Sequence, residues 1–422
     1  MDKLYQTTKD GPIHPTLEWI DITPQDGNYA FGYYDRDPFS KGNEYHLAFK
    51  FDQQIRLPKP GETATVGLIE VASKKFIPVA DTEAWCHQQG SMTQWLSNEP
   101  GNFIFNDFKK EAGGNLRLYS RVHDINGNFV RDYDYPVYRL SPDGKVAATL
   151  NFNRIPRRGY TYASATWPEE VPVPDLENDG LFLLDMETGK KKLIIPYKTI
   201  LEKHPLPEDF VFDGENGVYD MFYHWMNHTC FNSDGSRVMV LHRYQQIFGW
   251  KTFMWTCRLD GSDLICSLPY KYWFHWGISH QLWGRTPREI IVDGDNKHER
   301  PDGKHMQYLV FDEDKGADTA TSVSDGFGFK GHLNFSPDGK WLIGDCYPID
   351  NLQYLNLTRV EDGKIVHIGT FYHGDEQKGD WRCDLHPRWS ADGKYLSVDT
   401  IHHGDRRILI LDMEESIETL FE

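Results

Sequence analysis

The stretch His386-Pro-Arg-Trp-Ser-Ala-Asp-Gly-Lys-Tyr-Leu-Ser-Val-Asp-Thr400 decides the fold, because the chain repeats its pattern several times. A polar residue opens a short strand, a Ser-x-Asp-Gly turn follows, and a second strand of alternating apolar residues comes next. Asp-Gly between two alternating runs is a strong hairpin signal. Close copies begin at His332 and His228, and a copy beginning at His280 keeps the strands without the glycine turn.

The spacing of these copies indicates a ring of blades. The four histidines follow one another at intervals of 52, 52 and 54 residues. Weaker copies without histidine precede them at the turns of Gly42 and Gly144, and Ser91–Leu96 fits between those two with a longer turn. Seven units of roughly 50 residues are typical of four-stranded propeller blades. We therefore expect an all-β protein, a single seven-bladed β-propeller.

The two ends of the chain are expected to meet in one blade. Residues 1–15 read as an N-terminal lead-in, and residues 16–422 as the propeller. The alternating segment Thr16–Thr23 is predicted to pair with Arg407–Met413 and so close the last blade, which leaves no open inner edge. We place blade 1 from Asp35 to about residue 79, and insertion loops at about 153–223 over the mouth of the central channel.

Composition limits the choice of partners. The net charge of −18 argues against nucleic acid and against an anionic membrane surface. No run of 18 apolar residues exists, so we expect no membrane span. The first ten residues lack an apolar stretch, which predicts a cytoplasmic protein. The alternative is a periplasmic or secreted protein whose leader was removed. We expect a monomer.

The repeated histidine is a candidate metal ligand. Equivalent positions at the start of the innermost strands converge at the channel, so His228, His280, His332 and His386 should form an arc there. Converging neutral imidazoles bind a divalent ion such as Zn²⁺ or Mn²⁺, and Ca²⁺ is a further candidate. The alternative is that each histidine ties its own blade together by hydrogen bonds. Asp384 is a channel-facing acid, and no organic cofactor is expected.

A second group of residues suits an acidic sugar. Tyr138, Arg154, Arg158 and Tyr160 gather basic and phenolic groups over the channel of an acidic protein, with His87 on the preceding blade. Arginine presents a rigid fork that matches a carboxylate. A uronic acid has such a carboxylate and an acidic proton on the adjacent carbon. β-Elimination there needs a positive group, a base for the C5 proton and an acid for O4.

Several motifs resemble known lyases. Phe31–Phe39, His87–Trp95, Phe105–Asp107 and Asp384–Trp389 resemble stretches of seven-bladed propeller polysaccharide lyases that act on ulvan or on rhamnose–glucuronate linkages. Oligogalacturonate lyase is a more distant resemblance, and the repeats themselves resemble the Ser-Pro-Asp-Gly repeats of TolB-like proteins. The resemblance covers nearly the whole chain.

The resemblance implies roles for individual residues. His87 matches the first catalytic histidine, Tyr138 the tyrosine acid or base, and Arg154 the arginine that binds the carboxylate. Where those lyases place a second histidine, this chain has Asn106, so the base is either Tyr138 or His87. We expect the remaining substrate contacts to come from Gln88, Asn106, Arg158, Tyr160, His224 and Arg243.

Three functions are compatible with these residues. The first is a lyase that cleaves an acidic poly- or oligosaccharide at a uronic acid by β-elimination. The second is a propeller that binds glycan or protein without chemistry, which the 13 tryptophans would suit. The third is a metal-assisted glycoside hydrolase that uses acids such as Asp35 or Asp384. Fold alone does not choose among them.

Overall fold

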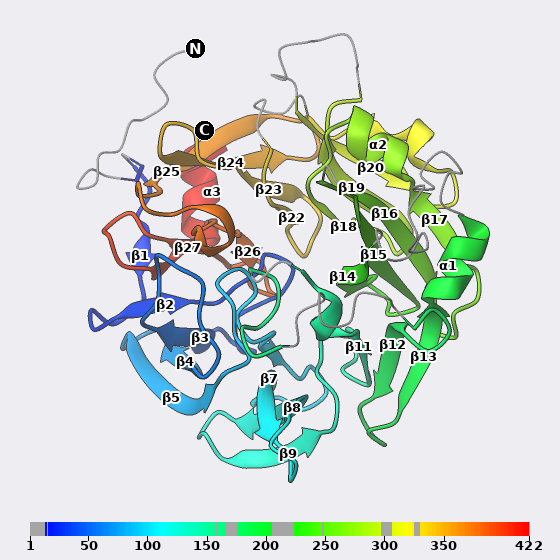
Figure 1. Ribbon diagram of the computed structural model, residues 1–422. Coiled ribbons are helices and arrows are strands. Elements are labelled where there is room, and N and C mark those ends of the chain that lie inside the picture. Colours follow the sequence, from blue (N-terminus) through cyan, green and yellow to red (C-terminus); the bar gives the residue numbers. More distant parts are fainter. Residues whose placement is uncertain are drawn as a thin grey trace.

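Seven four-stranded antiparallel sheets surround a central axis in the computed structural model of the protein (Figure 1). The residues described are 13–14, 16–156, 159–165, 175–204, 223–246, 249–296, 306–324 and 330–421. Within them each sheet is one blade, and successive blades follow the chain around the ring. The prediction of an all-β, seven-bladed propeller is confirmed.

The blades take their strands in chain order from the axis outward, except that β1 from the N-terminus is the outermost strand of blade 7 (Figure 1). Blades 1 to 3 contain β2 (Asn28–Ala30), β3 (Tyr45–Phe51), β4 (Ala64–Glu70), β5 (Lys75–Thr82); β6 (Gln94–Trp95), β7 (Asn102–Lys110), β8 (Leu116–Asp124), β9 (Phe129–Tyr133); and β10 (Arg139–Leu140), β11 (Val146–Thr149), β12 (Gly180–Asp185), β13 (Lys191–Pro196). Blades 4 and 5 contain β14 (Tyr223–Phe231), β15 (Arg237–Gln246), β16 (Gly249–Arg258), β17 (Ile265–Leu268); and β18 (Gln281–Trp283), β19 (Glu289–Gly294), β20 (Gln307–Asp312), β21 (Thr321–Ser322). Blades 6 and 7 contain β22 (Leu333–Phe335), β23 (Trp341–Asp345), β24 (Leu352–Arg359), β25 (Ile365–Tyr372); and β26 (Arg388–Trp389), β27 (Tyr395–Thr400), β28 (Arg407–Asp412), β1 (Ile20–Asp21).

The N-terminal strand closes the ring, as predicted. β1 pairs antiparallel with β28, with Ile20 opposite Ile410 and Asp21 opposite Leu409, and Figure 1 shows blue β1 beside the red C-terminal blade. The paired segment is shorter than the predicted strand. Asp21 accepts the Thr23 backbone N–H at 2.8 Å, and this local turn ends the strand.

The Ser-x-Asp-Gly turns explain the repeat. In blade 6 the Ser336 hydroxyl donates to Asp338 at 2.7 Å and accepts the Trp341 N–H at 3.0 Å. Gly339 follows with φ of 70°, a left-handed conformation that glycine adopts without a steric penalty. The turn therefore requires serine, aspartate and glycine at those positions.

Blade 1 begins earlier than predicted. Its innermost strand is β2, not a segment starting at Asp35. The chain leaves the sheet after Ala30, and Gly32, with φ of 124°, lies in the irregular segment 31–38 that follows. Asp399 of blade 7 accepts the backbone N–H groups of Phe31 and Gly32 at 3.2 Å. This departure directs Tyr33 and Tyr34 toward the axis.

Among the described residues, three α-helices lie outside the blades: α1 (Tyr197–Lys203), α2 (Tyr270–His275) and α3 (Met413–Phe421). α1 falls within the predicted insertion at about 153–223, of which residues 157–158, 166–174 and 205–222 lie outside the described part of the chain. No helix among the described residues is long and apolar enough to cross a membrane.

A buried ion pair joins the last blade to the first. Arg388 is fully buried, its guanidinium contacts Asp399 at 2.7 Å, and it donates to the Gly32 carbonyl at 3.0 Å. We expect Arg388→Met to lower the free energy of unfolding by about 3–5 kcal/mol, because Asp399 would lose its buried counter-charge.

Chemical denaturation measures this effect, with Arg285→Met as the matched control. Arg285 pairs with Glu289 at 2.6 Å, but its side chain is one-third exposed, so its removal should cost under about 1 kcal/mol. Equal losses in the two variants would contradict the role of the Arg388–Asp399 pair.

Candidate functional site

Four histidines and two tyrosines meet at the axis. The His332 ring centroid lies 4.2 Å from those of His280 and His386. Tyr33 of the blade 1 segment lies 5.1 Å from His228 and 4.9 Å from His386, and Tyr34 lies 4.9 Å from His332. Side chains of blades 1, 4, 5, 6 and 7 can touch one another only near the centre of the ring. We call these six residues the axial cluster.

Part of the axial cluster forms a candidate metal centre. His332, Asp384 and His386 are buried, and one ligand atom from each lies within 4.8 Å of the others. His332 Nε2 and His386 Nε2 are buried without a hydrogen-bond partner among the described residues, and Asp384 Oδ2 lies 3.9 Å from His386 Nε2. Buried polar atoms are nearly always paired, so two unpaired imidazole nitrogens beside a buried carboxylate fit a cation. Two imidazoles and one carboxylate suit Mn²⁺ or Zn²⁺.

The Nδ1 atoms of the two histidines, which face away from the triad, are already hydrogen-bonded. His332 Nδ1 bonds to Asp345 at 3.1 Å, and His386 Nδ1 donates to the Gly32 carbonyl at 2.8 Å. Such contacts fix the tautomer that leaves Nε2 as a ligand. Burial alone would raise the pKa of Asp384, but Arg382 and His332 bring it below its ordinary value, so the carboxylate is ionised.

His280 and His228 lie outside this triad. Both ring nitrogens of His280 are occupied, Nδ1 by Asp293 at 3.0 Å and Nε2 by the Tyr347 hydroxyl at 3.1 Å. His228 has φ of 50° and donates its backbone N–H to the Tyr138 hydroxyl. The ligand role of all four histidines therefore stays a prediction, and the geometry favours His332 and His386.

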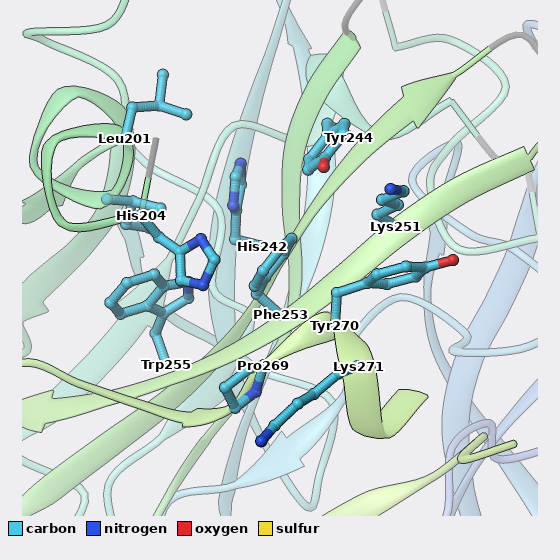
Figure 2. A pocket seen from close by; sticks show the side chains of 11 residues that line it. Leu201, His204, His242, Tyr244, Lys251, Phe253, Trp255, Pro269, Tyr270 and Lys271 are labelled. Carbon is cyan, nitrogen blue, oxygen red and sulfur yellow. The ribbon is translucent and has the colours of Figure 1, made fainter. Parts of the chain in front are cut away.

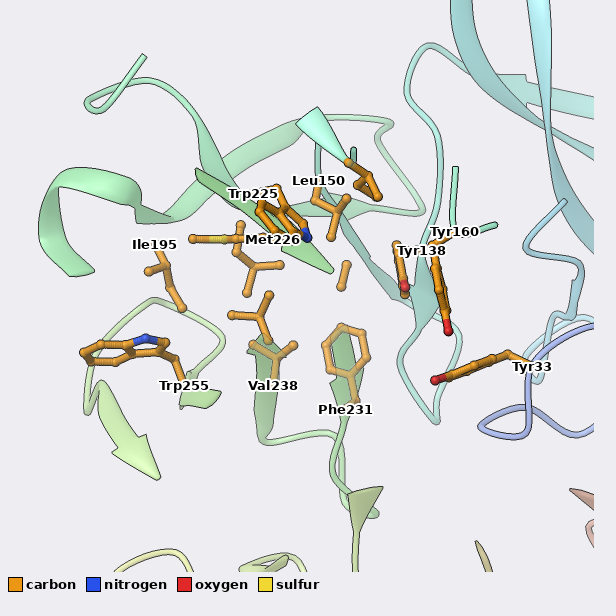
Figure 3. Close-up of a cluster of buried hydrophobic side chains, with 14 of the residues drawn as sticks. Tyr33, Tyr138, Leu150, Tyr160, Ile195, Trp225, Met226, Phe231, Val238 and Trp255 are labelled. Carbon is orange, nitrogen blue, oxygen red and sulfur yellow. The ribbon is translucent and has the colours of Figure 1, made fainter. Parts of the chain in front are cut away.

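Tyr138 is buried beside the axial cluster. Its hydroxyl lies 3.0 Å from Gln89 Nε2, 3.1 Å from Gln89 Oε1 and 3.0 Å from the His228 amide. Burial raises the pKa of Tyr138 well above its ordinary value, so the phenol stays protonated. Figure 3 shows Tyr138, Tyr160 and Tyr33, which belong to one cluster of buried side chains. A neutral phenol in this place can donate a proton.

Arg154 lies at the end of a short 3₁₀ turn, Phe152–Arg154, in the blade 3 insertion. It is buried, and its Nε donates to the His224 carbonyl at 2.9 Å. The His224 ring stacks on His242, and His224 Nδ1 lies 3.0 Å from His242 Nε2. Tyr160 lies 5.4 Å from His228 and 6.2 Å from Tyr33, measured between ring centroids, so it joins the insertion to the axial cluster.

His87 and Gln88 lie in a tight loop between Cys86 and Gly90, which bridge each other. His87 Nε2 bonds to the Gln53 carbonyl, and its Nδ1 is buried without a partner in the described structure. An imidazole that donates from Nε2 has its lone pair on Nδ1, where it can accept a proton. Gln88 Nε2 donates to the Arg382 carbonyl at 3.1 Å.

The other residues predicted to contact substrate differ in whether their side chains are already hydrogen-bonded within the protein. Asn106 directs its side chain to Val137 and Tyr162, with bonds of 2.8 Å to the Val137 N–H, the Val137 carbonyl and the Tyr162 hydroxyl. These bonds give Asn106 a role in joining blades 2 and 3. Arg243 is buried on β15. Arg158 lies outside the described residues.

Arg382 was missing from the sequence prediction. Its Nε lies 2.8 Å from Asp384 Oδ2, and its guanidinium stands 5.2 Å from the centroid of the Tyr347 ring. It reaches the metal triad because it precedes Asp384 and His386 in one short segment. The only sequence signal was its place just before the repeated histidine.

Buried neutral histidines make the fold sensitive to acid. Burial, with nearby Arg406, Arg154 and His403 respectively, lowers the pKa of His87, His224 and His402 to about 3, against an ordinary 6.5. The unfolded chain takes up these protons below pH 6.5 and the folded chain does not, so stability falls as the pH drops from 6.5 toward 3. Each histidine contributes up to about 1.4 kcal/mol per pH unit.

Thermal unfolding between pH 7 and 4 tests this prediction. We expect the midpoint temperature of unfolding to fall steadily as the pH is lowered. His402→Gln should reduce this dependence on pH by the contribution of one titrating histidine. A midpoint that does not change over this range would contradict it.

Comparisons with known proteins support the fold. No family model and no curated protein match the chain. Among solved structures, an oligogalacturonate lyase from Vibrio parahaemolyticus aligns over 96% of this chain and 96% of its own, with a TM-score of 0.62 and 13% identity. An oligogalacturonate lyase in complex with manganese aligns over 96% and 97%, with a TM-score of 0.61 and 13% identity. The propeller domain of the trilobed protease from Pyrococcus furiosus is less similar, with a TM-score of 0.48 and 10% identity over 90% and 94%.

At this level of identity the likeness establishes a shared propeller fold along nearly the whole chain. The narrower resemblances, to lyases of ulvan and of rhamnose–glucuronate linkages and to TolB-like repeats, stay predictions.

Proposed function

We propose that this protein is an oligosaccharide lyase that cleaves the bond to a uronic acid by β-elimination, with a divalent ion at the axial cluster. The observation that carries this proposal is the buried triad of His332, Asp384 and His386, in which the Nε2 atoms of both histidines have no partner among the described residues. Further support comes from the full-length fold similarity to two oligogalacturonate lyases, one of them described in complex with manganese.

The ion would supply positive charge close to the substrate carboxylate. His332, Asp384 and His386 would hold it, and the bonds of His332 to Asp345 and of His386 to Gly32 would fix the ligand geometry. Positive charge aimed at a carboxylate stabilises the enolate-like charge that develops when the C5 proton leaves.

Protein groups would bind the uronate and move the protons. Arg154 would grip the carboxylate. His87, neutral and with a free Nδ1 lone pair, would take the C5 proton, and the positive imidazolium would be stabilised by the adjacent uronate. Tyr138, kept protonated by burial, would give its proton to the departing O4. The C5 electron pair then forms the C4–C5 double bond as the C4–O4 bond breaks.

The hydrolase alternative is less well supported. A glycosidase needs one carboxyl group that is protonated as an acid. Asp384 has a lowered pKa beside Arg382, and Asp35 lies 3.2 Å from Arg36 and 3.9 Å from Arg139. Both candidate acids are therefore paired with arginine. A propeller that only binds glycan stays a second possibility, because the aromatic axial cluster would also suit binding.

A panel of uronic-acid oligosaccharides tests the proposal. Each substrate is incubated with the protein loaded with Mn²⁺, and again after treatment with a chelator. We expect an ultraviolet-absorbing unsaturated product from at least one substrate, and a much lower rate with the chelator. Binding without turnover across the panel would favour the binding propeller, and reducing ends without absorbance would favour the hydrolase.

A further inference from the structure

A pocket lies in blade 4, outside the axial cluster. It has a volume of about 420 Å³ and is enclosed by α1, the strands β15 and β16, and the start of α2 (Figure 2). Its lining residues are Ile200, Leu201, His204, His242, Tyr244, Lys251, Phe253, Trp255, Pro269, Tyr270 and Lys271. A pocket of this size can enclose one or two sugar rings.

Aromatic faces dominate the wall. Tyr244 and Phe253 stack with 6.0 Å between ring centroids and an interplanar angle of 19°, and Phe253 lies 6.3 Å from Tyr270 and 4.9 Å from His204. Flat aromatic surfaces of this kind pack against the C–H face of a sugar ring and lose little entropy in doing so. Tyr270 is half-buried, and His204 is exposed.

Two buried polar atoms in the wall have no partner in the described residues. His242 Nε2 is bonded to His224, but His242 Nδ1 is not paired, and Trp255 Nε1 is not paired either. Both residues are only 2% exposed. A purely apolar ligand would leave these two atoms unsatisfied. A sugar offers an apolar face for the rings and hydroxyl groups for the two nitrogens.

The charge of the wall favours an acidic sugar. Lys251 and Lys271 line the pocket, and none of the described lining residues is acidic, although the chain carries a net charge of −18. Lys251 stands over the Tyr270 ring at 4.6 Å. Lys271 lies 3.8 Å from Asp318. Lys251 lies over the aromatic wall of the pocket and is the candidate to bind a carboxylate.

We infer that this pocket is a second sugar-binding site, which takes a uronate residue of the oligosaccharide whose neighbouring residue lies at Arg154. Arg154 and the pocket are linked through His224 and His242: Arg154 donates to the His224 carbonyl, His224 Nδ1 lies 3.0 Å from His242 Nε2, and His242 lines the pocket. The choice of an acidic oligosaccharide rests on the proposed function. The site then gives the protein a preference for chains longer than one residue.

Calorimetric binding of galacturonate trisaccharide to chelator-treated protein tests this inference. Tyr270→Ala removes the stacking face, and Phe274→Ala is the matched control, since Phe274 is on the same helix, 68% exposed and outside the lining. We expect Tyr270→Ala to weaken binding roughly tenfold and Phe274→Ala to leave it unchanged. Lys251→Met should weaken binding of the trisaccharide more than binding of its carboxyl-reduced form.

The two proposals fail separately. If no uronate yields an elimination product, but trisaccharide binding weakens only in Tyr270→Ala, then the second site stands and the lyase proposal falls. If elimination is observed and Tyr270→Ala binds and cleaves the trisaccharide like Phe274→Ala, then the second site is wrong. Absence of trisaccharide binding by the unmodified protein would also overturn it.

Discussion

Replacing Arg154 with alanine is expected to lower kcat/KM on a uronate oligosaccharide by about 10²–10³, the usual loss when one group that stabilises developing negative charge is removed. Arg154 is buried, and its Nε is anchored on the His224 carbonyl, so the fork is held in one orientation. Arg154→Lys keeps the charge without the fork and should recover part of the activity. Steady-state kinetics measure both variants.

Loss of folding must be separated from loss of catalysis. Arg237 is a buried arginine of blade 4 that pairs with Glu313 and Asp263 at 2.7 Å, outside the candidate site. Arg237→Ala should destabilise the protein to a similar degree and keep kcat/KM at a temperature where it is folded. If Arg237→Ala and Arg154→Ala lose activity equally, Arg154 has no specific role in binding the uronate.

The second large effect is expected at the metal triad. Asp384→Asn and His386→Ala should each weaken Mn²⁺ binding by at least about 100-fold, since even indirect contacts to a metal ligand are worth 10–100-fold. Equilibrium dialysis of the metal-free protein against Mn²⁺ measures this. His275→Ala is the control, since His275 is an exposed histidine at the end of α2. Binding that survives both triad variants would place the ion elsewhere, and absence of Mn²⁺ binding by the unmodified protein would exclude the site.

The repeat made most of the fold predictable. The blade turns require serine, aspartate and glycine at fixed positions. The spacing of these residues along the chain therefore predicts how many blades there are and where each one lies. Blade 5 lacks the glycine turn, yet its strands follow the histidine at the same distance. The closing strand was predictable because segments of alternating apolar residues lie near both ends of the chain, and pairing them in one sheet closes the ring.

The start of blade 1 was not predictable in the same way. Its turn at Gly42 resembles the others, but the inner strand lies before Gly32, and the chain between them crosses toward the axis. Only the contacts of Phe31 and Gly32 with Asp399, far apart in sequence, reveal this path. Tyr33 and Tyr34 therefore reached the axial cluster without a signal in the spacing.

The candidate site was predictable only in outline. Equal spacing predicts that the four histidines converge, but it carries no information on side-chain partners. Asp293 and Tyr347 occupy both ring nitrogens of His280, whereas His332 and His386 each keep an Nε2 without a partner among the described residues. Asn106 likewise looked available in sequence and is used entirely in joining two blades.

The mass balance of the reaction tests the central claim most directly. A uronate oligosaccharide of known mass is incubated with the Mn²⁺-loaded protein, and the masses of both products are measured by mass spectrometry. Elimination adds no atoms, so the two product masses should sum to the mass of the substrate, with one product absorbing in the ultraviolet. Products that together exceed the substrate by the mass of one water would show hydrolysis and contradict the account.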